Sequence, residues 1–275
     1  MFKCDYHTHT NFSFDGAPES TPDSLCLAAI AVGVTDLAIT DHFECNWRSE
    51  SYPPFDADGY YEAVMTAKEK YRDKLNLTYG IEIGQYSQIP EEANALLEKH
   101  DYDFIIGSIH NMRGETDFYY WDFNRIFAEK EQDYLGQTFE RYCDELCCVV
   151  DTLDKVDSIA HLTYMYRYCA LSGNRYDLTK YTDNAEKLFR KMVAKDIALE
   201  LNVSTLIKGL GFTMPDRDLL SLYKDCGGRL ITVGTDSHSP DHVGECVEDG
   251  FSLLRNVGLN DILVVRNGEK TIVKI

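Results

Sequence analysis

The chain of 275 residues carries 46 Asp and Glu residues against 27 Lys and Arg, a formal net charge of −19 at pH 7. This charge argues against a nucleic-acid-binding surface, because affinity for a phosphate backbone depends on clustered Lys and Arg. Hydrophobic residues make up 44% of the chain, which is enough to bury a sizeable core. No apolar run approaches the roughly 18 residues that a membrane-spanning helix needs, so we expect no membrane association.

The N-terminal residues, MFKCDYHTHT, lack the apolar core and the small-residue cleavage site of a secretory signal. The nine cysteines are scattered without a CxxC pair, which indicates free thiols rather than a zinc ribbon or a redox dithiol. Both observations predict a cytoplasmic protein.

Short apolar runs alternate with amphipathic stretches along the whole chain. Strands are predicted near residues 2–6, 36–40, 77–83, 104–108, 158–161, 198–202, 229–234 and 262–266. Helices are predicted at 21–32, 60–74, 90–99, 123–152, 181–195, 215–226 and 242–257. About seven β-α units in series predict an α/β fold with a parallel sheet covered by helices, most simply a closed barrel. No linker or repeat interrupts the series, so we expect one domain over residues 1–275.

Chemically active side chains gather where the predicted strands end, which is where barrels of this kind place their active sites. In chain order these residues are His7 and His9, Asp41 and His42, Glu82, His110, His161, Asn202, and Asp236 with His238. Six of the eight histidines are therefore at strand ends. The other two, His100 and His242, lie in or beside predicted helices, and we do not assign them to the site.

The spacing of His7 and His9 predicts that both side chains act on the same ligand. Side chains two apart on a strand point to the same face, so Asp5, His7 and His9 project together toward the barrel mouth. Two imidazoles with a carboxylate behind them suit a divalent cation. Glu82 lies in the apolar strand YGIEIG, where a carboxylate is costly unless it is paired or bound to metal. Any one of these histidines, taken singly, can equally be a buried residue without a ligand.

The order of these segments resembles that of the polymerase and histidinol phosphatase (PHP) superfamily. The matching segments are DYHTHT, TDH, GIEIG, GSIH, AHL and GTDSH. The resemblance implies a distorted (β/α)7 barrel with a trinuclear metal site. Two longer stretches, GTDSHSPDHVG and LELNVSTLIKG, resemble the monofunctional histidinol-phosphatases of this superfamily. They imply a hydrolase that converts L-histidinol phosphate to L-histidinol and inorganic phosphate in histidine biosynthesis.

The resemblance also implies which residues bind the three divalent ions. The first ion would be held by His7, His9, Glu82 and Asp236, the second by Glu82, His110 and His161, and the third by Asp15, His42 and His238. Asp15 departs from members that carry His at this position. The ions are zinc, manganese or iron, because sites built from His and carboxylates accept all three.

Three divalent ions against three ligand carboxylates would make a locally positive pocket, which suits a phosphate monoester even in an acidic chain. A water activated by the metals would attack phosphorus directly, without a phosphoenzyme. The leaving alcohol needs a proton, and Asp236 and His238 are the candidates for the general acid.

The phosphate also needs a cationic side chain beyond the metals. Arg167, after the fifth strand, is the first candidate and Lys208, after the sixth, is the second, with Arg113 and Arg125 behind them. Each alone can also be an ordinary surface residue. A segment after the fourth strand is either a lid over a substrate ring or a packed hydrophobic loop; its residues are Asp117, Tyr119, Tyr120 and Trp121.

Two other functions fit the same residues. One is a PHP-type phosphoesterase that acts on another small phosphate ester or on a nucleotide, against which the acidic charge counts. The other is a metal-dependent module without catalysis, against which the complete set of ligand positions counts.

Overall fold

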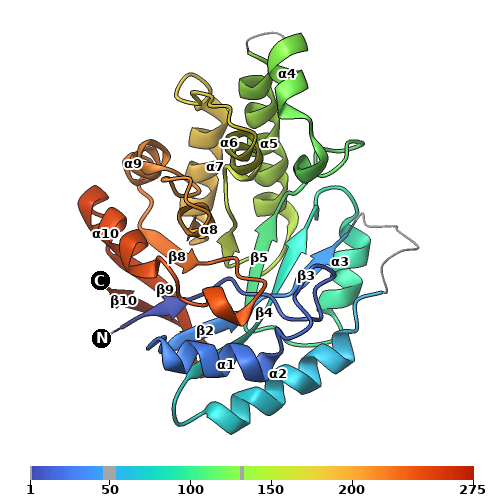
Figure 1. Cartoon of the computed structure of the whole chain (residues 1–275), viewed down its shortest axis with the longest axis vertical. Coiled ribbons are helices and arrows are strands. Elements are labelled where there is room, and N and C mark those ends of the chain that lie inside the picture. The colour runs from blue at the N-terminus through green and yellow to red at the C-terminus, as the bar shows by residue number, and fades with distance from the viewer. Residues whose placement is uncertain (1, 46–53, 131–132) are drawn as a thin grey trace.

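The computed structural model describes residues 2–45, 54–130 and 133–275 (Figure 1). Its strands are β1 (Cys4–Asp5), β2 (Asp36–Ile39), β3 (His42–Glu44), β4 (Asn76–Gly84), β5 (Phe104–Ser108), β6 (Ser158–Ile159), β7 (Ala198–Asn202), β8 (Leu230–Gly234), β9 (Asp261–Arg266) and β10 (Glu269–Lys274). Its α-helices are α1 (Pro22–Ala31), α2 (Ala57–Tyr71), α3 (Pro90–Leu97), α4 (Phe123–Glu129), α5 (Tyr134–Thr152), α6 (Tyr164–Leu171), α7 (Asp183–Ala194), α8 (Ser204–Ile207), α9 (Arg217–Asp225) and α10 (Val247–Val257). Two short 3-10 helices are η1 (Phe118–Tyr120) and η2 (Pro240–His242).

The strands form one mixed sheet in the order β1-β2-β4-β5-β6-β7-β8-β9-β10. Neighbours are parallel except for the terminal pair β9 and β10, which is antiparallel. The short strand β3 continues β2 along the same edge of β4, because Ile39 pairs with Tyr79 and His42 pairs with Glu82 at an unchanged offset. Together, β2 and β3 therefore follow β4 far enough to bring His42 beside Glu82.

The sheet curls until its first strand reaches β8. The Tyr6 amide donates to the Val233 carbonyl and the Asp236 amide to the His7 carbonyl, both at 2.8 Å. Within the described residues, the ring runs through β1, β2, β4, β5, β6, β7 and β8, and helices surround it (Figure 1). The predicted distorted (β/α)7 barrel is confirmed.

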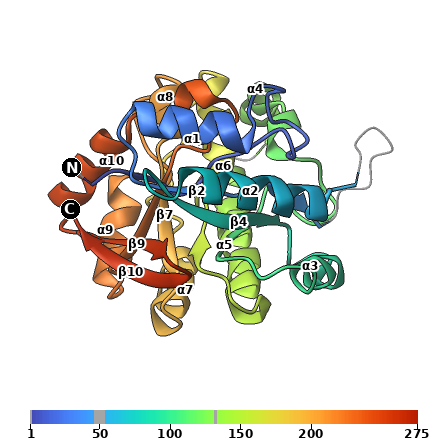
Figure 2. The ribbon, with the colours of Figure 1, turned by 90° about the horizontal axis from the view of Figure 1, so that it is seen from below.

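The hairpin of β9 and β10 lies outside this ring and seals its N-terminal end. The Tyr6 hydroxyl accepts from the Val265 amide at 2.6 Å, and the Arg266 guanidinium pairs with Asp36 at 2.7 Å. As a result, the two ends of the chain lie side by side in both views (Figures 1 and 2). The open, C-terminal end of the barrel is left for the functional side chains.

Local signals account for most element boundaries. The Thr21 hydroxyl accepts from the Ser24 amide in a capping box, with Pro22 as first helical residue, so α1 begins where predicted. The helix predicted at 123–152 is wrong as one element, because Lys130 adopts an extended backbone that ends α4. The helix predicted at 242–257 begins later, at Val247, after a turn that contains Gly244 with φ +70°. Among the strands and α-helices of the described residues, β3, β10, α6 and α8 were not predicted.

Nearly all buried hydrophobic side chains of the described residues belong to one cluster that fills the barrel and the layer beneath the helices. None of the helices in the described part of the chain is long and apolar enough to cross a membrane. All nine cysteines are free thiols, and seven of them are buried, in agreement with the sequence prediction.

Candidate metal centre

The barrel brings Glu82 to the centre of the predicted ligand set. Its carboxylate is fully buried on β4. The distances from its oxygens to ring nitrogens are 2.8 Å to His42 Nδ1, 3.0 Å to His161 Nε2, 3.1 Å to His7 Nε2, 3.3 Å to His110 Nε2 and 3.6 Å to His9 Nε2. Five histidines from four different segments thus meet one carboxylate, as the bridging role implied for Glu82 requires.

The other predicted ligands lie at the edge of this cluster. Asp236 Oδ1 is 3.3 Å from His9 Nε2, and Asp15 Oδ2 is 3.2 Å from His238 Nε2. The Nε2 atoms of His42 and His238 are 3.3 Å apart. The structure therefore brings all nine predicted ligands together, and their role as ligands stays a prediction.

Three overlapping groups in the described residues place their potential ligand atoms within 4.8 Å of one another. They are His7, His9 and Glu82; His42, Glu82 and His110; and His9, His42 and His238. Imidazole and carboxylate donors at this density fit divalent zinc, manganese or iron. The arrangement matches a polynuclear site.

The state of His9 supports this fit. Its Nε2 is buried without a hydrogen-bond partner, although a buried polar atom is normally paired. Burial lowers the pKa of His9 well below its usual value, and the neighbouring His42 and His238 lower it further. The ring is therefore neutral, with the nitrogen lone pair that a metal ion requires.

The acidic side chains of the cluster stay ionised. Burial raises the pKa of Glu82, but His42, His7 and His110 outweigh it and hold the pKa well below the usual range. The pKa of Asp236 is likewise held low, against its burial, by His7 and by the adjacent ring of His9. Both carboxylates thus have the charged form that binds cations.

Carboxylates in and around the cluster raise the pKa values of three histidines. Burial alone would lower these pKa values. At His7, the negative charges of Glu200 and Glu82 outweigh burial and raise the pKa. Glu82 and Asp15 do the same at His42. Glu44 and Glu82 do so at His110. Without metal, these imidazoles therefore hold protons that an ion has to displace.

Asp5 does not have the position expected of it. Its carboxylate accepts from the amide and hydroxyl of Thr235, at 2.9 and 2.6 Å, and from the Gly244 amide at 2.9 Å. It therefore anchors the loop after β8 rather than backing the two histidines. The carboxylate that backs His7 is instead that of Glu200, whose Oε1 lies 2.6 Å from His7 Nδ1.

Sequence reasoning thus missed two buried carboxylates, Glu200 on β7 and Glu44 on β3. Glu44 Oε1 lies 2.8 Å from His110 Nδ1, and the pKa of Glu44 falls to about 2 because His110 outweighs its burial. Glu200 lies in the apolar strand ALELN. A carboxylate in an apolar strand is the pattern that identified Glu82 as a candidate ligand. Glu44 follows His42 at the two-residue spacing that places both on one face of a strand.

Two other polar residues at strand ends have structural roles. Asp41 accepts from the Thr10 amide at 2.6 Å and from the Ser13 hydroxyl at 2.5 Å, which fixes the loop after β1. The Asn202 side chain accepts from the Ser204 amide at 3.1 Å and starts α8.

Arg167 lies beside the cluster, on the unpredicted helix α6. Its guanidinium packs over the rings of Tyr164 and Tyr168, 4.6 and 5.0 Å from their centroids, and Nη1 donates to Asp236 Oδ2 at 2.8 Å. Partial burial and the charge of Arg167 lower the pKa of Lys208, whereas the charge of Asp236 raises it. Through its contact with Asp236, Arg167 lies next to the candidate metal ligands.

The two lesser candidates for the phosphate contact lie elsewhere. Arg113 donates to the Ser87 carbonyl at 2.6 Å, and Arg125 pairs with Glu129 at 2.7 Å on the exposed face of α4. Neither contacts a predicted ligand.

The segment after β5 divides into a packed part and an exposed part. Trp121 packs on Phe118, with ring centroids 4.8 Å apart, and donates to the Thr116 carbonyl. Tyr119 and Tyr120 are 64% and 62% exposed, and the Tyr119 ring is 5.7 Å from that of Tyr168. The packed-loop interpretation therefore applies to Trp121, and a lid formed by Tyr119 and Tyr120 stays a prediction.

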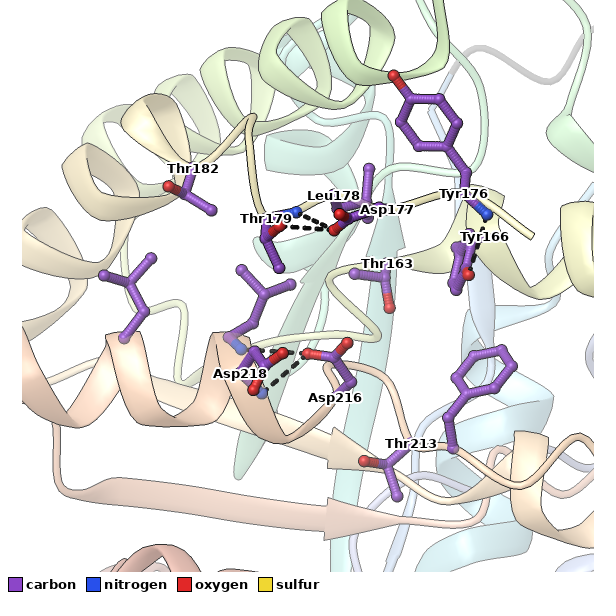
Figure 3. Close-up of a pocket in the computed structure, with 13 residues that line it drawn as sticks. Thr163, Tyr166, Tyr176, Asp177, Leu178, Thr179, Thr182, Thr213, Asp216 and Asp218 are labelled. Carbon is purple, nitrogen blue, oxygen red and sulfur yellow. Dashed lines mark hydrogen bonds between the residues drawn. The ribbon is translucent and has the colours of Figure 1, made fainter.

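A separate pocket of about 290 Å³ lies between α6, α9 and the loop before α7 (Figure 3). Tyr166, Tyr176, Phe212 and Asp216 are among the residues that line it, whereas none of the nine predicted ligands does.

Comparison with known proteins agrees with the geometry. Histidinol-phosphatase of Lactococcus lactis is 27% identical over 95% of this chain and 94% of its own length. A protein of Clostridium acetobutylicum named Probable histidinol-phosphatase is 28% identical over 94% and 95%. The solved structure of the Lactococcus lactis phosphatase, in complex with zinc, L-histidinol and phosphate, superimposes with a TM-score of 0.81 at 23% identity, covering 98% of this chain and all of that one.

The family comparison covers most of the metal centre. The model of the PHP domain matches residues 5–204, which contain seven of the nine predicted ligands. The chain belongs to the PHP domain family.

Proposed function

We propose that this protein hydrolyses L-histidinol phosphate to L-histidinol and inorganic phosphate at a centre of three divalent metal ions. The gathering of the nine predicted His and carboxylate ligands in one cluster, with five of the histidines around Glu82, carries the proposal. The similarity to histidinol-phosphatases along nearly the whole chain supports the choice of substrate.

The proposed ions would occupy the three ligand sets that the resemblance implies, with Glu82 shared between two of them. When bound, they supply Lewis-acid activation of a water and of the phosphate oxygens. The protein's own contribution is to hold the ligands close together, and the ring of His9 stacks on those of His42 and His238 at centroid distances of 4.1 and 4.2 Å.

Arg167 is the proposed contact for the substrate phosphate. The planar guanidinium can donate two parallel hydrogen bonds to phosphate oxygens. Its stacking on Tyr164 and Tyr168 fixes its plane, and its Nε is buried without a partner. Lys208 would add a second, more exposed positive charge on the same side.

His238 is the better of the two candidates for the general acid. The low pKa of Asp236 keeps its carboxylate ionised, so it cannot donate a proton. His238 is partly exposed, with 29% of its side chain accessible, and its Nδ1 donates to the Asp236 carbonyl at 3.0 Å. Its Nε2 lies 3.3 Å from His42 Nε2, and it would donate a proton to the leaving alkoxide only when it does not bind the third ion.

The alcohol part of the substrate would lie toward the segment after β5. Burial raises the pKa of Asp117, whereas the charges of His110 and Arg167 lower it, which supports a position for this carboxylate near the proposed site. A substrate ammonium or imidazolium group would pair with Asp117, while the exposed ring of Tyr119 covers it.

The test is phosphate release by protein reconstituted with manganese or zinc, using L-histidinol phosphate, p-nitrophenyl phosphate and a dinucleotide. We expect a strong preference for L-histidinol phosphate. Release only from the other two esters would assign the site to a different small phosphate ester or a nucleotide. No release from any ester by the metal-loaded protein would favour a module without catalysis.

A further inference from the structure

We propose that Glu200 is a positioning residue that couples two of the metal sites, because one of its oxygens orients His7 and the other holds the backbone of His161. The inference rests on the proposed metal centre and not on the identity of the substrate.

The first oxygen sets the orientation of the His7 ring. Glu200 Oε1 lies 2.6 Å from His7 Nδ1, and both side chains are almost fully buried. A carboxylate at Nδ1 fixes the proton there, so the lone pair of the opposite nitrogen is free for a metal ion. That nitrogen, Nε2, faces Glu82 at 3.1 Å and Asp236 at 3.7 Å, the other proposed ligands of the first ion.

The second oxygen holds the turn that carries His161. Glu200 Oε2 accepts from the His161 main-chain amide at 2.7 Å and from Asn202 Nδ2 at 3.2 Å. His161 has φ +23°, a left-handed conformation that non-glycine residues rarely adopt without support. In this conformation its Nε2 lies 3.0 Å from Glu82 and 3.4 Å from His110 Nε2, within the second proposed site.

The neighbouring strand leaves room for this arrangement. Gly234 on β8 pairs with Asn202 on β7, and a Cβ added to Gly234 would lie 2.6 Å from Glu200 Oε1 and 2.3 Å from the His7 Cβ. The contact between Glu200 and His7 therefore needs a glycine at this position. Both oxygens of Glu200 are already engaged, one by His7 Nδ1 and the other by the His161 amide, which argues for an indirect role.

The substitution Glu200→Gln tests the proposal with little change in shape. Glutamine has one acceptor oxygen in place of two, so it can serve either His7 or the His161 amide but not both. Metal-free protein would be titrated with zinc against a competing chelator, with bound ions counted by elemental analysis and cobalt(II) absorption as a second readout. We expect about 10- to 100-fold weaker binding of two ions, while the ion proposed at Asp15, His42 and His238 binds as before.

Asp157→Asn is the matched control. Asp157 is also a buried carboxylate that accepts a main-chain amide, from Ile105 at 2.7 Å, but it lies at the opposite end of β6 and pairs with Lys270. We expect this variant to lower the melting temperature and leave all three metal affinities unchanged. Glu200→Asp keeps the charge but is one methylene too short to span both contacts, and it replaces Glu200→Gln if that variant does not fold.

Wild-type affinity for all three ions in the Glu200 variant would overturn the proposal. So would an equal weakening of all three ions in the Glu200 and Asp157 variants, since that would reflect general instability. Because the readout is metal binding, failure to hydrolyse L-histidinol phosphate would refute the proposed function without affecting this inference.

Discussion

Replacing Arg167 by alanine tests the proposed phosphate contact. A hydrogen bond between charged groups contributes about 1.5–3 kcal/mol, which corresponds to a roughly 10- to 150-fold change in an equilibrium constant. In the free protein, however, Arg167 already donates to Asp236 Oδ2 at 2.8 Å and to the Ser204 hydroxyl at 3.3 Å. Part of the gain on binding phosphate is therefore offset, and we expect the lower part of the range, about 10- to 30-fold.

The assay is steady-state hydrolysis of L-histidinol phosphate, together with product inhibition by inorganic phosphate. KM and the inhibition constant of phosphate should both rise in Arg167→Ala, while elemental analysis finds the wild-type number of ions. Arg125→Ala is the control, because Arg125 is 71% exposed and pairs with Glu129; its KM should not change. An unchanged KM in Arg167→Ala, with a raised KM in Lys208→Ala, would refute the assignment and move the contact to Lys208.

Three further outcomes are expected. His9→Ala should abolish turnover with little change in the melting temperature of the metal-free protein, because the His9 Nε2 makes no hydrogen bond; near-wild-type turnover would disprove its role as ligand. Metal binding should release protons near pH 7 and become tighter as the pH rises. The reason is that the raised pKa values of His7, His42 and His110 keep these rings protonated in the metal-free protein. A calorimetric enthalpy of metal binding that does not depend on the buffer would contradict this. Gly234→Ala should cost about 1–3 kcal/mol in the free energy of unfolding, because its Cβ would meet His7 and Glu200; an unchanged urea midpoint would show that the site relaxes.

The positions of the candidate ligands along the chain were predictable because they depend on local pattern. The strands β5 (Phe104–Ser108) and β7 (Ala198–Asn202) have the predicted bounds, since each is a short apolar run that ends in a polar residue. Parallel strands end at the same edge of a barrel, so the polar residues that follow them meet without any further information.

Which side chains pair across the barrel was not predictable. Asp5 shares a strand face with His7, yet β8 supplies its partners, Thr235 and Gly244. Glu200 takes the expected place beside His7, although 193 residues separate the two in sequence. Such contacts depend on the register of β1 against β8 and of β7 against β8, which single-strand patterns do not contain.

The sequence by itself determined the barrel class and the convergence of its histidines and acidic residues, because the strand pattern follows from local composition. Only the tertiary structure decided which carboxylate supports which imidazole, and where Arg167 lies, on a helix that the sequence pattern did not reveal. The physical reason is that these interactions join residues from different strands, and their distances are set by the closure of the barrel rather than by any segment of the chain.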